Sequence, residues 1–173
     1  MTKITFVRHG ETDWNRAKKI QGSVDVPLNE TGRKQAQETA KSLRGKKFDA
    51  IYSSPLARAR ETAEIIAGGD VQIDERLKER CFGPLEGLDW ENLPKEEPWD
   101  VPGGESINEL TARVVDFIDE VAITHKGGNV LVVAHAIVGL VFHVHFHGAP
   151  ADGNFFKITV PNANAVEYVK EGK

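Results

Sequence analysis

The sequence predicts an α/β fold, a three-layer α/β/α sandwich around a mostly parallel central sheet. Strand-like and helix-like segments alternate along the 173 residues, which is typical of strands joined by crossover helices. The run Val130–Ala134 is apolar throughout, as expected for a central strand that helices cover on both faces. Hydrophobic residues make up 40% of the chain and charged residues 28%, the balance of an ordinary globular protein. We therefore expect a single domain over 1–173.

The first half of the chain alternates strand and helix candidates. Apolar and polar residues alternate over 3–7, which predicts a strand that runs into a loop. Apolar residues recur at helical spacing over 29–43, where either Asn29 or Thr31 could be the cap. Pro55 suits the first turn of the next helix. The elements expected here are strands at 3–7, 49–53 and 71–73 and helices at 29–43 and 55–66.

The second half begins with a loop-rich stretch, 82–104, that holds four prolines and two of the three tryptophans. A loop of this length is usually functional. Ser106 and Glu109 then form a capping-box pair at the start of a long amphipathic helix. The elements expected here are a helix from 106 to at least 121, a strand at 130–134, a helix at 137–146 and a closing hairpin of 155–160 with 165–169.

Charge and composition argue against several classes of protein. The net charge of −4 argues against nucleic-acid binding through overall attraction. The longest apolar stretch is interrupted at His135, so we expect no membrane span and no membrane partner. The N-terminal residues do not resemble a signal peptide, which favours a cytoplasmic location. Cys81 is the single cysteine, so no internal disulfide or thiolate metal site is expected.

Two histidines, His9 and His135, each follow directly on a predicted central strand. The carboxyl ends of parallel strands meet at one edge of a sheet, so both should stand where ligands bind. Arg8, Arg58 and Glu79 fall in segments expected to reach the same edge. Guanidinium and imidazole donors suit a phosphoryl group, which spreads negative charge over its oxygens. The residues therefore predict an anion pocket.

Short motifs run through most of the chain in a fixed order. They include Arg8-His9-Gly10-Glu11-Thr12, Trp14-Asn15, Gln21-Gly22, Tyr52-Ser53-Ser54-Pro55-Leu56, Arg58-Ala59, Glu79, Phe82-Gly83, Gly104-Glu105-Ser106 and His135. The series resembles the histidine phosphatase superfamily, the phosphoglycerate-mutase-like proteins. A lone Arg-His-Gly would be weak evidence, but this many ordered matches make coincidence negligible.

The resemblance implies a phosphatase that hydrolyses small phosphate monoesters through a phosphohistidine intermediate, with no metal or other cofactor. His9 would be the nucleophile, and the adjacent Arg8 would disfavour its protonated form. Glu79 would protonate the leaving alkoxide and then activate the water that hydrolyses the phosphohistidine. The catalytic residues implied are His9, Glu79, Arg8, Arg58 and His135.

The resemblance also implies which residues hold the substrate, a small-molecule phosphomonoester. They are Arg8, Asn15, Gln21, Gly22, Arg58, Arg80, His135 and Ala136. Ala136 departs from the family, which usually has glycine after the second histidine, and its side chain adds bulk where backbone approaches the ligand. Trp90, Lys95 and Trp99 lie in the loop expected to shape the leaving-group pocket, although they could simply anchor that loop. The sequence leaves a homodimer open.

Several of these residues have an ordinary structural alternative. Asn15 could cap a helix or close a turn without touching phosphate. Glu79 lies in a charged run, and such runs are usually solvated surface. Glu75, in the same run, is the alternative acid. Arg60 is interpreted as a surface residue.

His143, His145 and His147 form a further cluster. On a helix, His143 and His147 would share one face and could hold a metal ion. Histidines at a helix end or an interface are the commoner case, so no metal site is predicted.

Two other functions remain open. The segment from Glu79 to Phe82-Gly83 resembles the mutase version of its loop. Against a phosphoglycerate mutase, the mutases carry a longer insertion with paired arginines, and no two arginines are adjacent here. A non-catalytic module that binds phosphate esters is the third interpretation, although every catalytic position is filled. Phosphatase is the favoured function.

Overall fold

The computed structural model describes residues 1–93, 101–151, 155 and 158–171. The strands in this part of the chain form one five-stranded sheet in the order β3-β2-β4-β1-β5. They are β1 (Thr2–Arg8), β2 (Ala50–Ser53), β3 (Gln72–Ile73), β4 (Asn129–Ala134) and β5 (Ala165–Lys170). All neighbouring pairs are parallel except β5, which runs antiparallel to β1. The predicted mostly parallel sheet is therefore confirmed.

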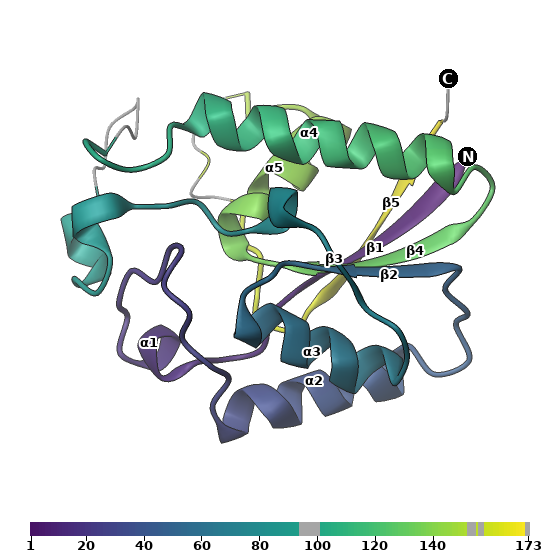
Figure 1. Cartoon of the computed structure of the whole chain (residues 1–173), viewed down its shortest axis with the longest axis horizontal. Coiled ribbons are helices and arrows are strands. Elements are labelled where there is room, and N and C mark those ends of the chain that lie inside the picture. Colours follow the sequence, from purple (N-terminus) through teal and green to yellow (C-terminus); the bar gives the residue numbers. More distant parts are fainter. Residues whose placement is uncertain (94–100, 152–154, 156–157, 172–173) are drawn as a thin grey trace.

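Helices cover both faces of the sheet (Figure 1). On one face lie α2 (Glu30–Ser42) and α3 (Ala57–Ala67), and on the other lie α4 (Ile107–Thr124) and α5 (Ala136–His147). This arrangement confirms the three-layer α/β/α sandwich. The described part of the chain contains no helix that is both long and apolar enough to cross a bilayer.

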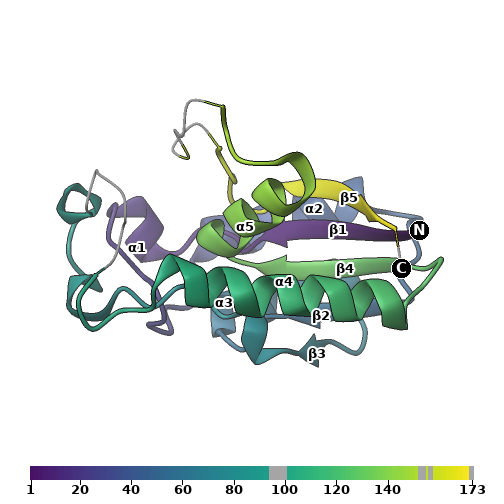
Figure 2. The same cartoon turned by 90° about the horizontal axis from the view of Figure 1, so that it is seen from above.

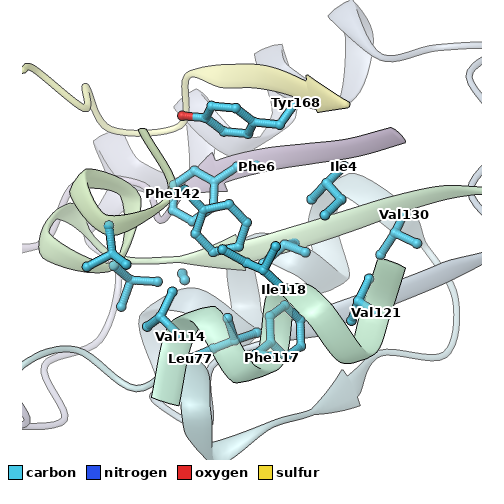
Figure 3. Packing of buried hydrophobic residues seen from close by; sticks show 14 of the residues in the cluster. Ile4, Phe6, Leu77, Val114, Phe117, Ile118, Val121, Val130, Phe142 and Tyr168 are labelled. Carbon is cyan, nitrogen blue, oxygen red and sulfur yellow. The ribbon is translucent and has the colours of Figure 1, made fainter. Parts of the chain in front are cut away.

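Residue alternation along β4 builds a core on each face. Val130, Val132 and Ala134 belong to the cluster that contains α4 and α5, whereas Leu131 and Val133 pack with α3 and partly buried residues near it. Successive side chains of a strand point to opposite faces, so a strand between two helical layers is apolar at every position. Figure 3 shows the α4–α5 cluster, where aromatic side chains of β1, α5 and β5 pack together.

Side-chain caps define the starts of two helices. Ser106 caps α4, and its capping box with Glu109 forms as predicted. The cap of α2 is Asn29 and not Thr31. The side-chain oxygen of Asn29, Oδ1, accepts a hydrogen bond from the Gly32 amide at 2.9 Å. Each cap satisfies an amide that would otherwise lack a partner in the first turn.

The start of α3 differs from the prediction. The sequence places Pro55 in the first turn, but the helix begins at Ala57. The Ser54 hydroxyl accepts a hydrogen bond from the Leu56 amide, and the Asp25 carboxylate accepts one from the Ala57 amide at 2.7 Å. These bonds hold the residues before Ala57 in a turn, so the predicted start is wrong.

The connections contain short helices that the sequence analysis did not predict. They are α1 (Asp13–Arg16) and the 3₁₀ helices η1 (Glu75–Leu77), η2 (Gly83–Leu85) and η3 (Trp90–Asn92). The described part of the loop-rich stretch 82–104 thus holds two turns of 3₁₀ helix. Lys95 and Trp99 lie outside the described residues.

The predicted closing hairpin is wrong. β5 pairs with β1 along its whole length, from Thr2 opposite Lys170 to Val7 opposite Ala165. Of the predicted partner strand 155–160, residues 156 and 157 lie outside the described part, and 158–160 form no strand. The pairing edge of β5 is taken by β1, and Val160 instead accepts a hydrogen bond from the Arg8 guanidinium at 2.7 Å.

The carboxyl ends of β1 and β4 point toward the end of the molecule where α1 lies (Figure 2). Arg8 and Ala134, the last residues of these strands, are opposite each other in the sheet. The residues that follow, His9 and His135, therefore emerge side by side, as predicted.

Candidate active site

His9 and His135 form the centre of the site. Their ring centroids are 5.1 Å apart, and both side chains are buried, His9 at 3% exposure and His135 at 0%. Burying two imidazoles next to two arginines costs folding free energy, and such clusters are typical of sites that bind a ligand or carry out a reaction.

A cavity of about 230 Å³ opens beside His9. Eight of the ten predicted site residues line it: Arg8, His9, Asn15, Gln21, Gly22, Arg58, Glu79 and Ala136. Of the other two, His135 lies against the His9 ring, and Arg80 lines an adjoining cavity. Lys19 and Ile137 also line the site, and the sequence analysis did not identify them.

The hydrogen bond of His9 determines which ring nitrogen is free. Nδ1 lies 2.7 Å from the Gly10 carbonyl oxygen. A carbonyl only accepts, so Nδ1 carries the proton and Nε2 keeps its lone pair. Burial, and then the charges of Arg58 and Arg8, lower the pKa of His9 well below its ordinary value. The sequence analysis attributed this effect to Arg8, but burial is the larger cause.

His135 is held by a serine that the sequence analysis did not assign to the site. Its Nε2 lies 2.7 Å from the Ser54 hydroxyl, whereas its buried Nδ1 has no partner among the described residues. Burial and the charge of Arg58 lower the pKa of His135 well below its ordinary value. The Ser-Ser-Pro motif before Arg58 was the available signal for Ser54.

The two arginines of the site are anchored by backbone carbonyls. Arg58 donates to the carbonyls of Val24 and Gly22 at 2.7 and 2.8 Å, and Arg8 donates to that of Val160. In both side chains Nε is buried and has no partner within the described ranges. Burial lowers the pKa of Arg58 to about 10, so the guanidinium remains charged at neutral pH. Arg60, in contrast, is an exposed partner of Glu64, consistent with the surface role expected of it.

Gly22 permits the loop that receives Arg58. Its φ is +52°, and a Cβ there would lie 2.1 Å from a carboxylate oxygen of Glu86. Glu86 uses that oxygen to accept hydrogen bonds from the amides of Ser23 and Phe82. The carboxylate therefore joins the loop after Gln21 to the loop after Glu79, a role that the sequence analysis missed.

Asn15 has the capping role that the sequence analysis gave as its structural alternative. Its side-chain oxygen, Oδ1, accepts a hydrogen bond from the Thr12 amide and completes the capping box of α1. The side chain also lines the cavity. The Thr12 hydroxyl donates to the Gln21 side chain at 2.8 Å, and Asn162 donates to the His9 carbonyl at 2.9 Å. Asn162 thus supports the site from a segment that the sequence analysis interpreted only as a hairpin turn.

Glu79 is the acidic residue of the cavity. Its two oxygens accept from the backbone amides of Arg80 and Ile137, at 3.0 and 3.1 Å. Burial raises the pKa of Glu79, and the backbone bonds partly oppose that rise. Glu75 is exposed in η1 and is not among the described residues that line the cavity, so of the two candidate acids it is Glu79 that lies with the histidines.

The histidine cluster of α5 lies away from this cavity. His143 and His147 face each other with ring centroids 4.8 Å apart, and His145 contacts the Lys170 ammonium. Within the residues described, no group of three or more histidine, cysteine, aspartate or glutamate side chains could hold a metal ion.

The buried neutral state of His9 predicts how stability depends on pH. Because its folded pKa is lowered, the unfolded chain binds more protons below about pH 6.5, so folding stability is lost as the pH falls. The loss is about 1.4 kcal/mol per pH unit for such a group. His9→Asn should therefore flatten the pH dependence of the unfolding free energy, measured in urea from about pH 7.5 to about pH 5.5. Glu79 acts in the opposite sense but is present in both proteins, and parallel curves would contradict the prediction.

The fold and the site together define the class of protein. A family model for the histidine phosphatase superfamily, branch 1, matches residues 4–172, and the chain belongs to this family.

Individual relatives include both phosphatases and mutases. A Bacillus subtilis protein named uncharacterized phosphatase PhoE is 42% identical over 140 residues, 78% of this chain and 72% of its own. A probable phosphoglycerate mutase, GpmB of Salmonella choleraesuis, is 38% identical over 152 residues, 79% of this chain and 71% of its own. A phosphoserine phosphatase mutant from Entamoeba histolytica, solved with phosphoserine, has a TM-score of 0.87 at 30% identity and covers 98% of this chain and 91% of its own.

Proposed function

We propose that this protein hydrolyses small phosphate monoesters through a phosphohistidine on His9, with Glu79 as general acid and base. The observation that carries the proposal is the state of His9: a buried imidazole whose Nδ1–H is held by the Gly10 carbonyl, so that the Nε2 lone pair is free. The phosphatases among the relatives support the same activity.

In the first step, Nε2 of His9 attacks phosphorus and the bond to the ester oxygen breaks. The developing alkoxide takes the proton of Glu79, whose pKa is raised by burial, a direction that favours the protonated form. The products of the step are the free alcohol, phosphohistidine and the Glu79 carboxylate.

The phosphoryl oxygens need donors throughout this transfer. Nε of Arg8, Nε of Arg58 and Nδ1 of His135 are buried, and none has a hydrogen-bond partner in the described chain. Buried donors without partners are unfavourable, and an anion between them would satisfy all three. The Ser54 hydroxyl, by donating to Nε2 of His135, would keep the proton on Nδ1. Asn15 lies at the wall of the same cavity.

In the second step, the Glu79 carboxylate takes a proton from a water molecule that attacks phosphorus on the side vacated by the alcohol. The phosphorus–nitrogen bond breaks, inorganic phosphate leaves, and His9 and Glu79 return to their starting states. The arginines supply the positive charge that stabilises both transition states.

A mutase is the second candidate, because the GpmB relative carries that name. A mutase returns the phosphoryl group to another oxygen of the same molecule and must exclude water meanwhile. Supplying 3-phosphoglycerate and following both isomerisation and phosphate release separates the two, and we expect release to dominate.

The proposal predicts inhibition by vanadate and indifference to chelators. Vanadate beside His9 resembles the trigonal-bipyramidal transition state and should inhibit phosphate release from p-nitrophenyl phosphate at concentrations far below KM. EDTA should leave the same rate unchanged. Activity lost to EDTA and restored by a divalent cation would contradict the metal-free mechanism, and no release at all would favour a module that only binds phosphate esters.

A further inference from the structure

A second cavity, of about 300 Å³, adjoins the catalytic one. Most of the described residues in its wall are apolar, and they include Phe82, Leu93, Val101, Ile137, Leu140 and Val160. Its volume lies at the lower end of the range for small-molecule pockets, about 300–1,000 Å³. A cavity of this size and lining suits a compact apolar group of a ligand.

The two cavities share part of their walls. Phe82, Leu93 and Ile137 line both, as do Arg8, Trp90 and Ala136. Ile137 marks the boundary: its side chain lines both cavities, and its amide holds a carboxylate oxygen of Glu79 at 3.1 Å. Glu79, the proposed general acid, therefore lies where the ester oxygen of a substrate that occupies both cavities would be.

Among the described residues, two charged side chains line the second cavity, Arg8 and Arg80, and each is held by a backbone carbonyl. Arg8 donates to the Val160 carbonyl, and its buried Nε has no hydrogen-bond partner among the described residues. Arg80 donates through Nε to the Glu105 carbonyl at 2.8 Å, and its guanidinium lies over the Phe82 ring at 5.3 Å. Such stacking and backbone bonding make both side chains part of the wall.

From this geometry we infer the substrate class: phosphate monoesters of apolar alcohols, either short alkyl chains or a single aromatic ring. The inference rests on the proposed function. The phosphoryl group binds beside His9, the ester oxygen faces Glu79, and the alcohol carbon skeleton fills the cavity lined by Leu140 and Val101. Ala136 contributes its methyl group to the boundary, where glycine would leave it less apolar.

Unbranched alkyl phosphates test the inference, because their alcohols from propyl to hexyl hardly differ in acidity. Any trend in kcat/KM then reports contact with the cavity. Each buried methylene should raise kcat/KM about fourfold, or about 60-fold from propyl to hexyl phosphate. Phosphoserine and 3-phosphoglycerate should be poorer substrates than butyl phosphate, since each would place a carboxylate against the apolar wall.

Two substitutions of Leu140 locate the effect. Leu140→Ala enlarges the cavity and should extend the rise in kcat/KM to longer chains, whereas Leu140→Trp fills it and should abolish the rise while ethyl phosphate is still hydrolysed. Val144→Ala, on the same helix but away from the cavity wall, is the matched control and should leave the series unchanged.

The outcomes separate this inference from the proposed function. No hydrolysis of any ester, including p-nitrophenyl phosphate, would overturn both. Hydrolysis with a flat or falling alkyl series, or with phosphoserine or 3-phosphoglycerate preferred over butyl phosphate, would overturn the inference alone. A rise that both Leu140 variants leave unchanged would place the alcohol outside this cavity and would also overturn it.

Discussion

His9→Ala is expected to lower hydrolysis of every phosphate monoester by on the order of 10⁵-fold or more, because removal of a covalent nucleophile is among the largest losses seen in enzymes. Among the described residues that line the cavity, no other side chain is an imidazole: His135 is not part of this lining, and its Nε2 is hydrogen-bonded to Ser54. The measurements are steady-state turnover of p-nitrophenyl phosphate and trapping of acid-labile label from a phosphorylated substrate.

Both signals should disappear together in His9→Ala. His143→Ala is the matched control, since His143 lies on α5 outside the catalytic cavity, and it should retain both turnover and label. If His9→Ala kept near-normal turnover, another residue would be the nucleophile. If it lost turnover but kept the label, the phosphoryl group would be carried by a residue other than His9.

Glu79→Gln is expected to have an effect that depends on the leaving group. A strongly basic alkoxide needs a proton to depart, whereas nitrophenolate leaves without one. Phosphorylation of His9 by alkyl phosphates should therefore slow by about 10²–10⁴-fold, and phosphorylation by p-nitrophenyl phosphate should slow far less. The amide keeps the shape of Glu79 and can still accept from the Arg80 or Ile137 amide, but it has no acidic proton.

Stopped-flow kinetics test this directly. Glu79→Gln should release a burst of nitrophenol followed by a slow steady state, because the water that hydrolyses phosphohistidine has lost its base. Glu75→Gln is the control, since Glu75 is exposed in η1, and it should behave as the wild type does. An equal loss with both leaving groups would place Glu79 in binding or packing.

Most of the fold was predictable because its signals are local. The apolar run of β4, the capping box at Ser106 and the alternation of strands with helices each specify an element from neighbouring residues alone. Apart from the start of α3 and the short helices, the main error concerns long-range pairing. β5 pairs with β1, some 160 positions away in the chain, and the segment before it is hydrogen-bonded to Arg8 instead. A sequence pattern records that a strand exists but not which strand it will join.

In the site, too, local signals were readable and long-range contacts were not. His9, His135, Arg58 and Glu79 were predictable as site residues because each lies in a motif, and the structure brings all four together. Ser54 was part of a motif but had no recognised role. Glu86 and Asn162 hold backbone groups from distant loops, and nothing in their local sequence indicates which groups those are.

By itself, the sequence determined the fold class, the family and the residues able to carry charge or attack phosphorus, because these depend on residue type and spacing. Only the tertiary structure decided how those residues behave. Burial lowers the pKa of His9 more than Arg8 does, and the Gly10 carbonyl selects the nitrogen that stays free. The apolar cavity beside Glu79 likewise exists only in the fold, since residues from 82 to 160 form its wall together. Desolvation and cavity shape are properties of packed neighbours, so they arise only when distant segments meet.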